Sequence, residues 1–144
     1  MTLIVENKKA LNLARRAEGA VQFWHRVDEE GGVLTLDLAA KILGISILEA
    51  NDYVSKGQIF TIDWEGERRI PGFQFKENGF IEHFHYLLAL MQEKSFSDIF
   101  ITSIFINTVT YTNRNDPVYR QLQHPIQKHQ LLEIQRCVLG AYGQ

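Results

Sequence analysis

The chain has 144 residues, of which 45% are hydrophobic and 22% charged, and its formal net charge is −2. Nine Phe, five Tyr and two Trp exclude a mainly disordered chain, and the net charge is unlike the basic excess of most nucleic-acid-binding proteins. No apolar run approaches the roughly 20 residues of a transmembrane helix, and the N-terminus does not read as a signal peptide. The one cysteine, Cys137, cannot form an internal disulfide, so we expect a cytoplasmic protein without membrane contact.

Residues 3–29 carry the first pattern along the chain. Apolar and small residues recur every three or four positions from Ala10 to Val27, which predicts an amphipathic helix. Gly31 and Gly32 end the pattern. Residues 1–32 are therefore expected to form an N-terminal helix that packs on the domain or on a second copy of the chain.

Residues 33–56 predict two short helices. Thr35 can cap a helix over residues 36–43, and Gly44 suits a left-handed helix end. Ser46 and Glu49 have the spacing of a capping box that opens a second helix over residues 47–56. Two short helices joined by a glycine-containing turn indicate a helix-turn-helix.

A hairpin is predicted directly after the second helix. Residues 58–63 and 67–70 favour strands, Trp64 lies in the connection between them, and Pro71 ends the hairpin. It would form a wing that completes a unit over residues 33–75. Trp64 is a candidate partner-binding residue, although it can equally fold onto the helix-turn-helix.

Residues 76–144 are expected to be a helical region. A stripe from Phe80 to Met91 has helical spacing. Residues 97–109 are ambiguous, because their many β-formers favour a strand, whereas a helix here would be buried on all sides or shared with a partner. We expect a helix there, a further helix starting at Asp116-Pro117, and a last one over residues 126–139. The predicted fold is thus mainly α, with an N-terminal helix, a helix-turn-helix with a short β-hairpin wing, and a C-terminal helical region.

No catalytic residue, cofactor or metal site is predicted. The common nucleotide-binding, metalloprotease, redox and serine-hydrolase motifs are absent, so we expect a protein that is not an enzyme. His83 and His85 are two apart and would point to opposite sides of a helix, which does not suit a shared metal ion. The alternative is a small enzyme or ligand-binding domain built from scattered residues such as His83, His85, Tyr86 and Tyr111. Cys137 is expected to be a small buried residue.

Double-stranded DNA is a candidate partner of the helix-turn-helix. The residues offered to DNA by the second helix and the hairpin are Ser46, Asn51, Ser55, Lys56, Arg68 and Arg69. However, residues 33–72 hold six carboxylates and only four Lys or Arg, and phosphate neutralisation supplies most of the non-specific affinity for DNA. The unit can instead serve as a structural or protein-binding platform.

The segment from Leu34 to Ser46 resembles the opening of excisionase-like and MerR-like helix-turn-helix domains. Its continuation through the hairpin to Pro71, Phe73-Gln74-Phe75 and Gly79 is similar to small bacterial antitoxin-like proteins of the Xre–MbcA–ParS group. Those proteins have a "P-x-F-Q-F" sequence after the helix-turn-helix, then a glycine-containing turn and a helical toxin-binding region. By this resemblance the helical region over residues 76–144 is the partner-binding region, with its helices from residue 80 on. The resemblance spans residues 33–144, and the chain lacks the Trp that the family often has in the C-terminal region.

The resemblance implies a non-enzymatic, dimeric regulator that sequesters a partner protein, in many members a RES-domain toxin, and in some members also binds promoter DNA. It adds Tyr119, Tyr142 and Gln144 as partner-binding candidates beside Trp64. The alternative function is an excisionase-like or transcription-regulating DNA-binding protein. A homodimer is also expected because the first helix and residues 96–109 offer more apolar surface than a small chain buries.

Overall fold

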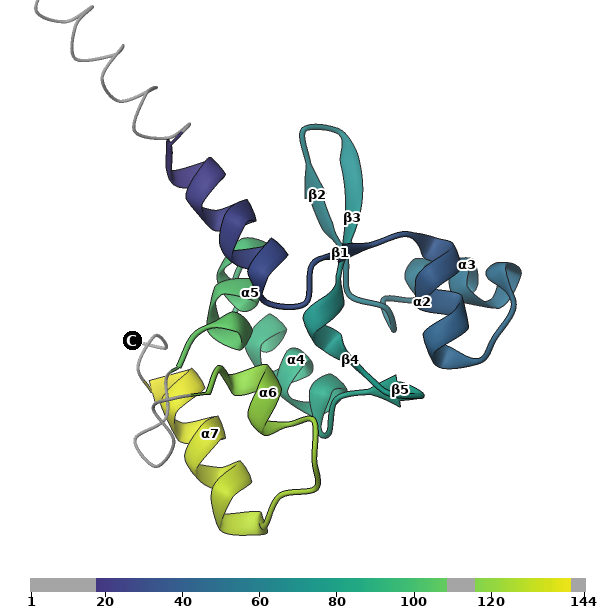
Figure 1. The fold of residues 1–144 in the computed structure, drawn as a ribbon. Coiled ribbons are helices and arrows are strands. Elements are labelled where there is room, and N and C mark those ends of the chain that lie inside the picture. Colours follow the sequence, from purple (N-terminus) through teal and green to yellow (C-terminus); the bar gives the residue numbers. More distant parts are fainter. Residues whose placement is uncertain (1–17, 109–115, 141–144) are drawn as a thin grey trace, which may run out of the picture.

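The computed structural model describes residues 18–108 and 116–140, which form a mainly α-helical fold with two small antiparallel sheets (Figure 1). Residues 18–29 are helical, as predicted, and residues 3–17 of the predicted helix lie outside the described part. The elements after this N-terminal helix are β1 (Val33–Leu34), α2 (Leu36–Leu43), α3 (Ile47–Ser55), β2 (Ile62–Trp64), β3 (Glu67–Pro71), η1 (Gly72–Gln74), β4 (Phe75–Lys76), β5 (Gly79–Phe80), α4 (Phe84–Glu93), α5 (Asp98–Ile106), α6 (Val118–Gln121) and α7 (Lys128–Gly140).

Helices α2 and α3 begin at the predicted caps. The Thr35 Oγ1 atom accepts the backbone N–H of Leu38 at 3.2 Å, and Gly44 ends α2 with a φ of 68°. Ser46 and Glu49 form the predicted capping box of α3, in which the Ser46 hydroxyl accepts the Glu49 N–H at 3.1 Å. These side chains satisfy N–H groups that have no partner within a helix, which explains why the helices start there.

Strands β1, β2 and β3 form a three-stranded antiparallel sheet in the order β1-β3-β2. The hairpin of β2 and β3 turns at Glu65 and Gly66, whose φ angles are 51° and 79°. Trp64 is therefore the last residue of β2, opposite Glu67, and does not lie in the connection as predicted, because a two-residue turn closes the hairpin. Strand β1 precedes α2 and pairs with the end of β3, Leu34 facing Ile70. The hairpin lies between the N-terminal helix and the α2–α3 pair (Figure 1).

The first strand of the hairpin is shorter than the predicted 58–63, because a side chain replaces its partner strand. The buried Gln74 amide accepts the Phe60 N–H at 2.8 Å and donates to the Phe60 carbonyl, also at 2.8 Å. A third bond runs from Gln74 Nε2 to the Pro71 carbonyl at 2.9 Å. The backbone of residue 60 is therefore paired without a ladder, and the strand starts at Ile62.

The helix predicted from Phe80 starts later. Phe80 lies in β5 opposite Phe75, and α4 begins at Phe84. Two long-range bonds hold the chain extended in between: the Ile81 N–H donates to the Gln74 carbonyl at 2.9 Å, and the Glu82 N–H to the Leu122 carbonyl at 2.7 Å. The spacing of apolar residues, from which the helix was predicted, does not reveal such long-range backbone hydrogen bonds.

Residues 98–106 form helix α5, so the strand alternative for this segment is wrong. Ser97 caps the helix, and its residues Ile101, Thr102, Ile104, Phe105 and Ile106 are buried within this single chain. Burial of α5 therefore needs no second copy, which removes one of the two reasons for expecting a dimer. Helix α6 starts after Pro117, which takes the cap position expected for Asp116, and α7 runs from Lys128 to Gly140.

The core is divided into two clusters that meet at the segment Phe73-Gln74-Phe75. The larger cluster joins Val27, Phe60 and Ile62 to α4–α7, and the smaller cluster holds α2 and α3 together. Phe73 belongs to the larger cluster, where it stacks on Phe105 with ring centres 5.1 Å apart, and Phe75 belongs to the smaller one. This segment thus joins the α2–α3 pair to the helical body.

Two glycines let the chain cross itself beside this joint. The Gly72 N–H donates to the Gly32 carbonyl at 2.8 Å. A Cβ atom at Gly72 would lie 2.1 Å from the Gly31 carbonyl oxygen, and one at Gly31 would lie 2.7 Å from the Phe73 nitrogen. Only residues without a side chain fit at this crossing, which holds the end of the N-terminal helix against the end of β3.

Candidate binding surfaces

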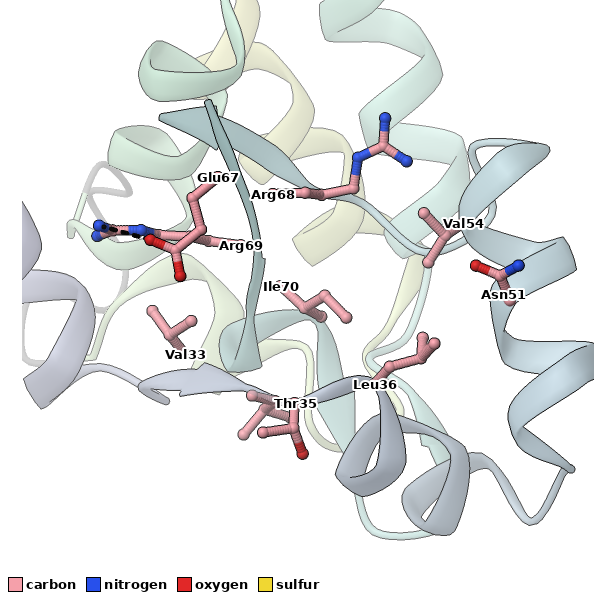
Figure 2. A pocket seen from close by; sticks show the side chains of 10 residues that line it. Val33, Thr35, Leu36, Asn51, Val54, Glu67, Arg68, Arg69 and Ile70 are labelled. Carbon is pink, nitrogen blue, oxygen red and sulfur yellow. Dashed lines mark hydrogen bonds and ion pairs between the residues drawn. The ribbon is translucent and has the colours of Figure 1, made fainter. Parts of the chain in front are cut away.

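A groove of about 390 Å3 lies between α3 and β3, with β1 at one end (Figure 2). Its apolar lining comes from Val33 of β1, Leu36 of α2, Val54 of α3 and Ile70 of β3. Arg68 points from β3 toward α3, where Asn51 also lines the groove, while the side chains of Glu67 and Arg69 lie on the other side of β3 (Figure 2).

The groove contains an open strand edge. Because Glu65 and Gly66 form a two-residue turn with positive φ, the flanking Trp64 and Glu67 are a hydrogen-bonded pair. Alternation along β3 then turns the backbone N–H and C=O of Arg68 away from β2 and toward the groove. Strand β1 covers β3 only opposite Ile70 and Pro71, so no strand of the described part pairs with Arg68 on that side.

The cations proposed to contact DNA lie against carboxylates of their own chain. Lys56 Nζ lies 2.9 Å from Asp52, and this pair raises the pKa of the lysine. Arg68 Nε lies 3.3 Å from Asp63, and Arg69 lies 3.5 Å from Glu67 while its guanidinium stacks on Trp24.

The polar DNA-binding candidates on α3 are also partly used within the helix. Ser46 is held in the capping box, and the Ser55 hydroxyl donates to the backbone carbonyl of Asn51 at 3.1 Å. Among these candidates, Asn51, Arg68 and Arg69 line one groove, and the Arg69 side chain lies on the other side of β3 from Arg68.

Apolar side chains are exposed on α2 and α3. Leu38 is 45% exposed, Ile47 53% and Leu48 83%. Leu48 occupies the first turn of the helix that would face DNA, a place where a phosphate-binding or base-reading side chain is expected. Exposed leucine and isoleucine suit a protein partner better than a nucleic acid.

Of the partner-binding candidates, Tyr119 lies in the core and is 5% exposed. Its hydroxyl donates to Glu30 at 2.6 Å, and Arg120 binds the same carboxylate at 2.9 Å, which ties α6 to the end of the N-terminal helix. A residue so placed positions elements and offers a partner little surface. Tyr142 and Gln144 lie outside the described residues.

Trp64 folds neither onto α2–α3 nor freely into solvent. It packs against Trp24 of the N-terminal helix, with ring centres 5.8 Å apart. The two rings line a second groove, of about 550 Å3, between that helix and the hairpin, together with Asp28, Glu65 and Arg69. We call this the tryptophan groove. The sequence pattern assigned Trp24 only to a packing stripe, because its partner lies forty residues further along the chain.

His83 and His85 lie at the start of α4. His83 has a φ of 59° and precedes α4, and His85 Nε2 lies 2.7 Å from the Gln58 carbonyl oxygen. No group of three potential metal ligands occurs among the residues that the structure describes, and Tyr111 is not one of them. Cys137 is buried, as predicted. No helix within residues 18–108 and 116–140 has the length and apolar character to cross a membrane.

Comparisons with protein-family models, curated proteins and solved structures find no match to this chain.

Proposed function

We propose that this chain is a non-enzymatic regulator that binds and occludes a partner protein, in the manner of the antitoxin-like proteins that it resembles. The order of N-terminal helix, β1, α2, α3, β2 and β3 supports a winged helix-turn-helix unit. Helices α4 to α7 then form the C-terminal helical region that such a regulator would require.

The observation that carries the proposal is the contrast between charged and apolar side chains on this unit. Lys56, Arg68 and Arg69 each lie against a carboxylate of the chain. DNA binding would have to break these pairs before phosphates could replace the carboxylates. Ile47 and Leu48, in contrast, are exposed and have an apolar surface to bury.

The groove beside α3 offers a mode of binding. An extended segment of the partner can pair with the open edge at Arg68 and continue the line of β1, with its apolar side chains over Val54 and Ile70. Strand addition of this kind supplies backbone hydrogen bonds, while the groove selects side chains.

The function is tested by co-expressing the protein encoded by the adjacent reading frame with and without this chain and following growth. We expect the neighbour to be toxic alone and harmless in the pair, and the two proteins to elute together in size-exclusion chromatography. A neighbour that is harmless alone, or toxic in both cases, contradicts the antitoxin function.

Two matched variants locate the contact. Leu48→Glu introduces a charge at an exposed position of α3, and Leu132→Glu does the same on α7, where the leucine is 48% exposed. We expect Leu48→Glu to weaken the complex by about tenfold or more, because a charge would be buried at an apolar interface. Loss of binding in Leu132→Glu alone would place the contact on the C-terminal helical region.

The arrangement of α2, α3 and the hairpin also supports a second candidate function, a DNA-binding regulator of the excisionase or transcription-factor kind. Asn51 and Arg68, which share the groove, would then contact the duplex. Gel-shift experiments with fragments of the gene's own promoter at low salt test this. Binding that weakens steeply with salt and is lost in Arg68→Ala supports DNA recognition, and no shift at low salt removes it.

A further inference from the structure

The tryptophan groove is built from one face of the N-terminal helix and one end of the hairpin. Ala20, Trp24 and Asp28 recur every four residues and so line a single helix face. Trp64 and Glu65 supply the opposite wall from the hairpin. The groove therefore combines two half-buried indole rings with a carboxylate on each side.

The surroundings of the groove are acidic. Asp28 and Glu65 are exposed, and neither forms an ion pair with another described residue. The basic side chains of the lining are Arg69, which lies 3.5 Å from Glu67, and His25, which lies 3.0 Å from Glu29. A cationic ligand would be attracted here, whereas a nucleic acid would be repelled.

The groove already accommodates one guanidinium. The Arg69 Cζ atom lies 4.3 Å from the centre of the Trp24 ring, the geometry of a cation–π contact. Trp64 lies beside this pair, and neither its ring nor Trp24 is stacked on a second cation within the described part. Guanidinium is thus a group for which the groove has both the aromatic surface and the opposite charge.

We propose that the tryptophan groove binds an arginine-containing segment of a basic partner protein. One arginine of that segment stacks on Trp64, and Asp28 and Glu65 accept hydrogen bonds from its guanidinium. This inference goes beyond the proposed function, because it does not depend on the partner being a toxin, and it concerns the side of the hairpin opposite the groove of Figure 2.

The chain carries its own reporter for the test. Its two tryptophans, Trp24 and Trp64, both line this groove, so tryptophan emission reports on it alone. Titration of the full chain with a short oligo-arginine peptide is expected to change the emission saturably, and with weaker affinity at higher salt. An oligo-glutamate peptide of equal length is the ligand control.

Variants assign the signal, with affinity measured by calorimetry so that the readout does not depend on the indoles. The double substitution of Asp28→Asn and Glu65→Gln is expected to weaken binding about three- to tenfold, because each removes an exposed attraction. Trp64→Leu is expected to weaken it about two- to fivefold by removing the ring.

The matched control neutralises two exposed carboxylates away from the groove, by Glu77→Gln and Glu93→Gln. It is expected to leave the affinity unchanged. No saturable emission change with oligo-arginine overturns the proposal, and so does equal weakening by the groove variant and the control. The groove carboxylates are exposed, so their variant tests the proposal even where Trp64→Leu fails to fold.

Discussion

Gln74 is a polar side chain with 0% exposure, and all of its hydrogen-bonding groups are directed at backbone atoms. A buried amide is tolerated only where its partners are present, because unmade hydrogen bonds in the interior are costly. Here the amide takes the place of a strand for residue 60 and also binds Pro71. The Gln74 side chain therefore links the loop before the hairpin to the segment that follows the hairpin.

Replacing Gln74 by Leu keeps the approximate volume and leaves the Phe60 N–H and two carbonyl groups without partners. We expect Gln74→Leu to lower the free energy of unfolding by about 2 to 4 kcal/mol. Urea denaturation followed by circular dichroism measures this. Gln92→Leu, at an exposed position of α4, is the control and should change stability by less than about 0.5 kcal/mol.

A second prediction for a single residue follows from the close approach of Gly31 and Gly72. Gly72→Ala places a methyl group 2.1 Å from a carbonyl oxygen, so the two backbones must separate. We expect a loss of about 3 kcal/mol or more, or no folded protein. Gly79→Ala is the matched control, because no atom lies within 4 Å of the added group there. Similar melting temperatures for the two variants would contradict the close crossing.

Local side chains stabilise the first turn of helix α3. Ser46 and Glu49 satisfy N–H groups at its start, and both are exposed, so packing contributes little to their effect. We expect Ser46→Ala to destabilise the protein by about 1 kcal/mol. Ser55→Ala, at the other end of the same helix, should cost less than about 0.5 kcal/mol in the same thermal denaturation series.

The N-terminal helix is tied to the body at two places. Arg26 donates to the Ile106 carbonyl at 3.0 Å, and Glu30 accepts from Tyr119 and Arg120. Burial raises the pKa of the Tyr119 phenol, and its hydrogen bond to Glu30 acts in the same direction. The neutral phenol is therefore the form that the folded chain favours.

This shift gives a pH dependence with a defined sign. Because the pKa of Tyr119 is higher in the folded state, its contribution to stability is complete below the ordinary tyrosine pKa and is lost as the pH rises through the folded value. Between pH ~9 and ~11 we expect the wild type to lose more unfolding free energy than Tyr119→Phe. Parallel stability curves for the two proteins would contradict the shift.

Short-range signals predicted the helices well and the strands less well. The caps at Thr35 and Ser46 act within three residues of themselves, so the pattern is sufficient to place them. Strand β1 has only two residues and exists because β3 lies beside it, a pairing that spans the α2–α3 pair. Local sequence signals do not reveal the tryptophan groove either, because its two rings come from elements that are far apart in the sequence.

At the scale of the whole molecule, the three expected regions all contribute to the larger of the two core clusters. Val27 of the first region and Ile62 of the second are buried with Leu87 and Phe105 of the third. We therefore expect a single unfolding transition, with tryptophan emission and far-ultraviolet circular dichroism giving the same midpoint in urea. A separate early transition seen only by the tryptophans would show that the N-terminal helix and the hairpin unfold on their own.

The crossing of the two glycines has a consequence for how the chain reaches this fold. Residues 32 and 72 are about forty positions apart, and closing a loop of that length costs conformational entropy that grows only slowly with length. Once the loop is closed there, Val33 and Pro71 are the next residues along and already stand opposite each other. A slip of one residue along β3 would exchange the buried Ile70 with Arg69. Two residues without side chains thus fix, through the place where the chain crosses itself, the strand alignment in which Ile70 is buried.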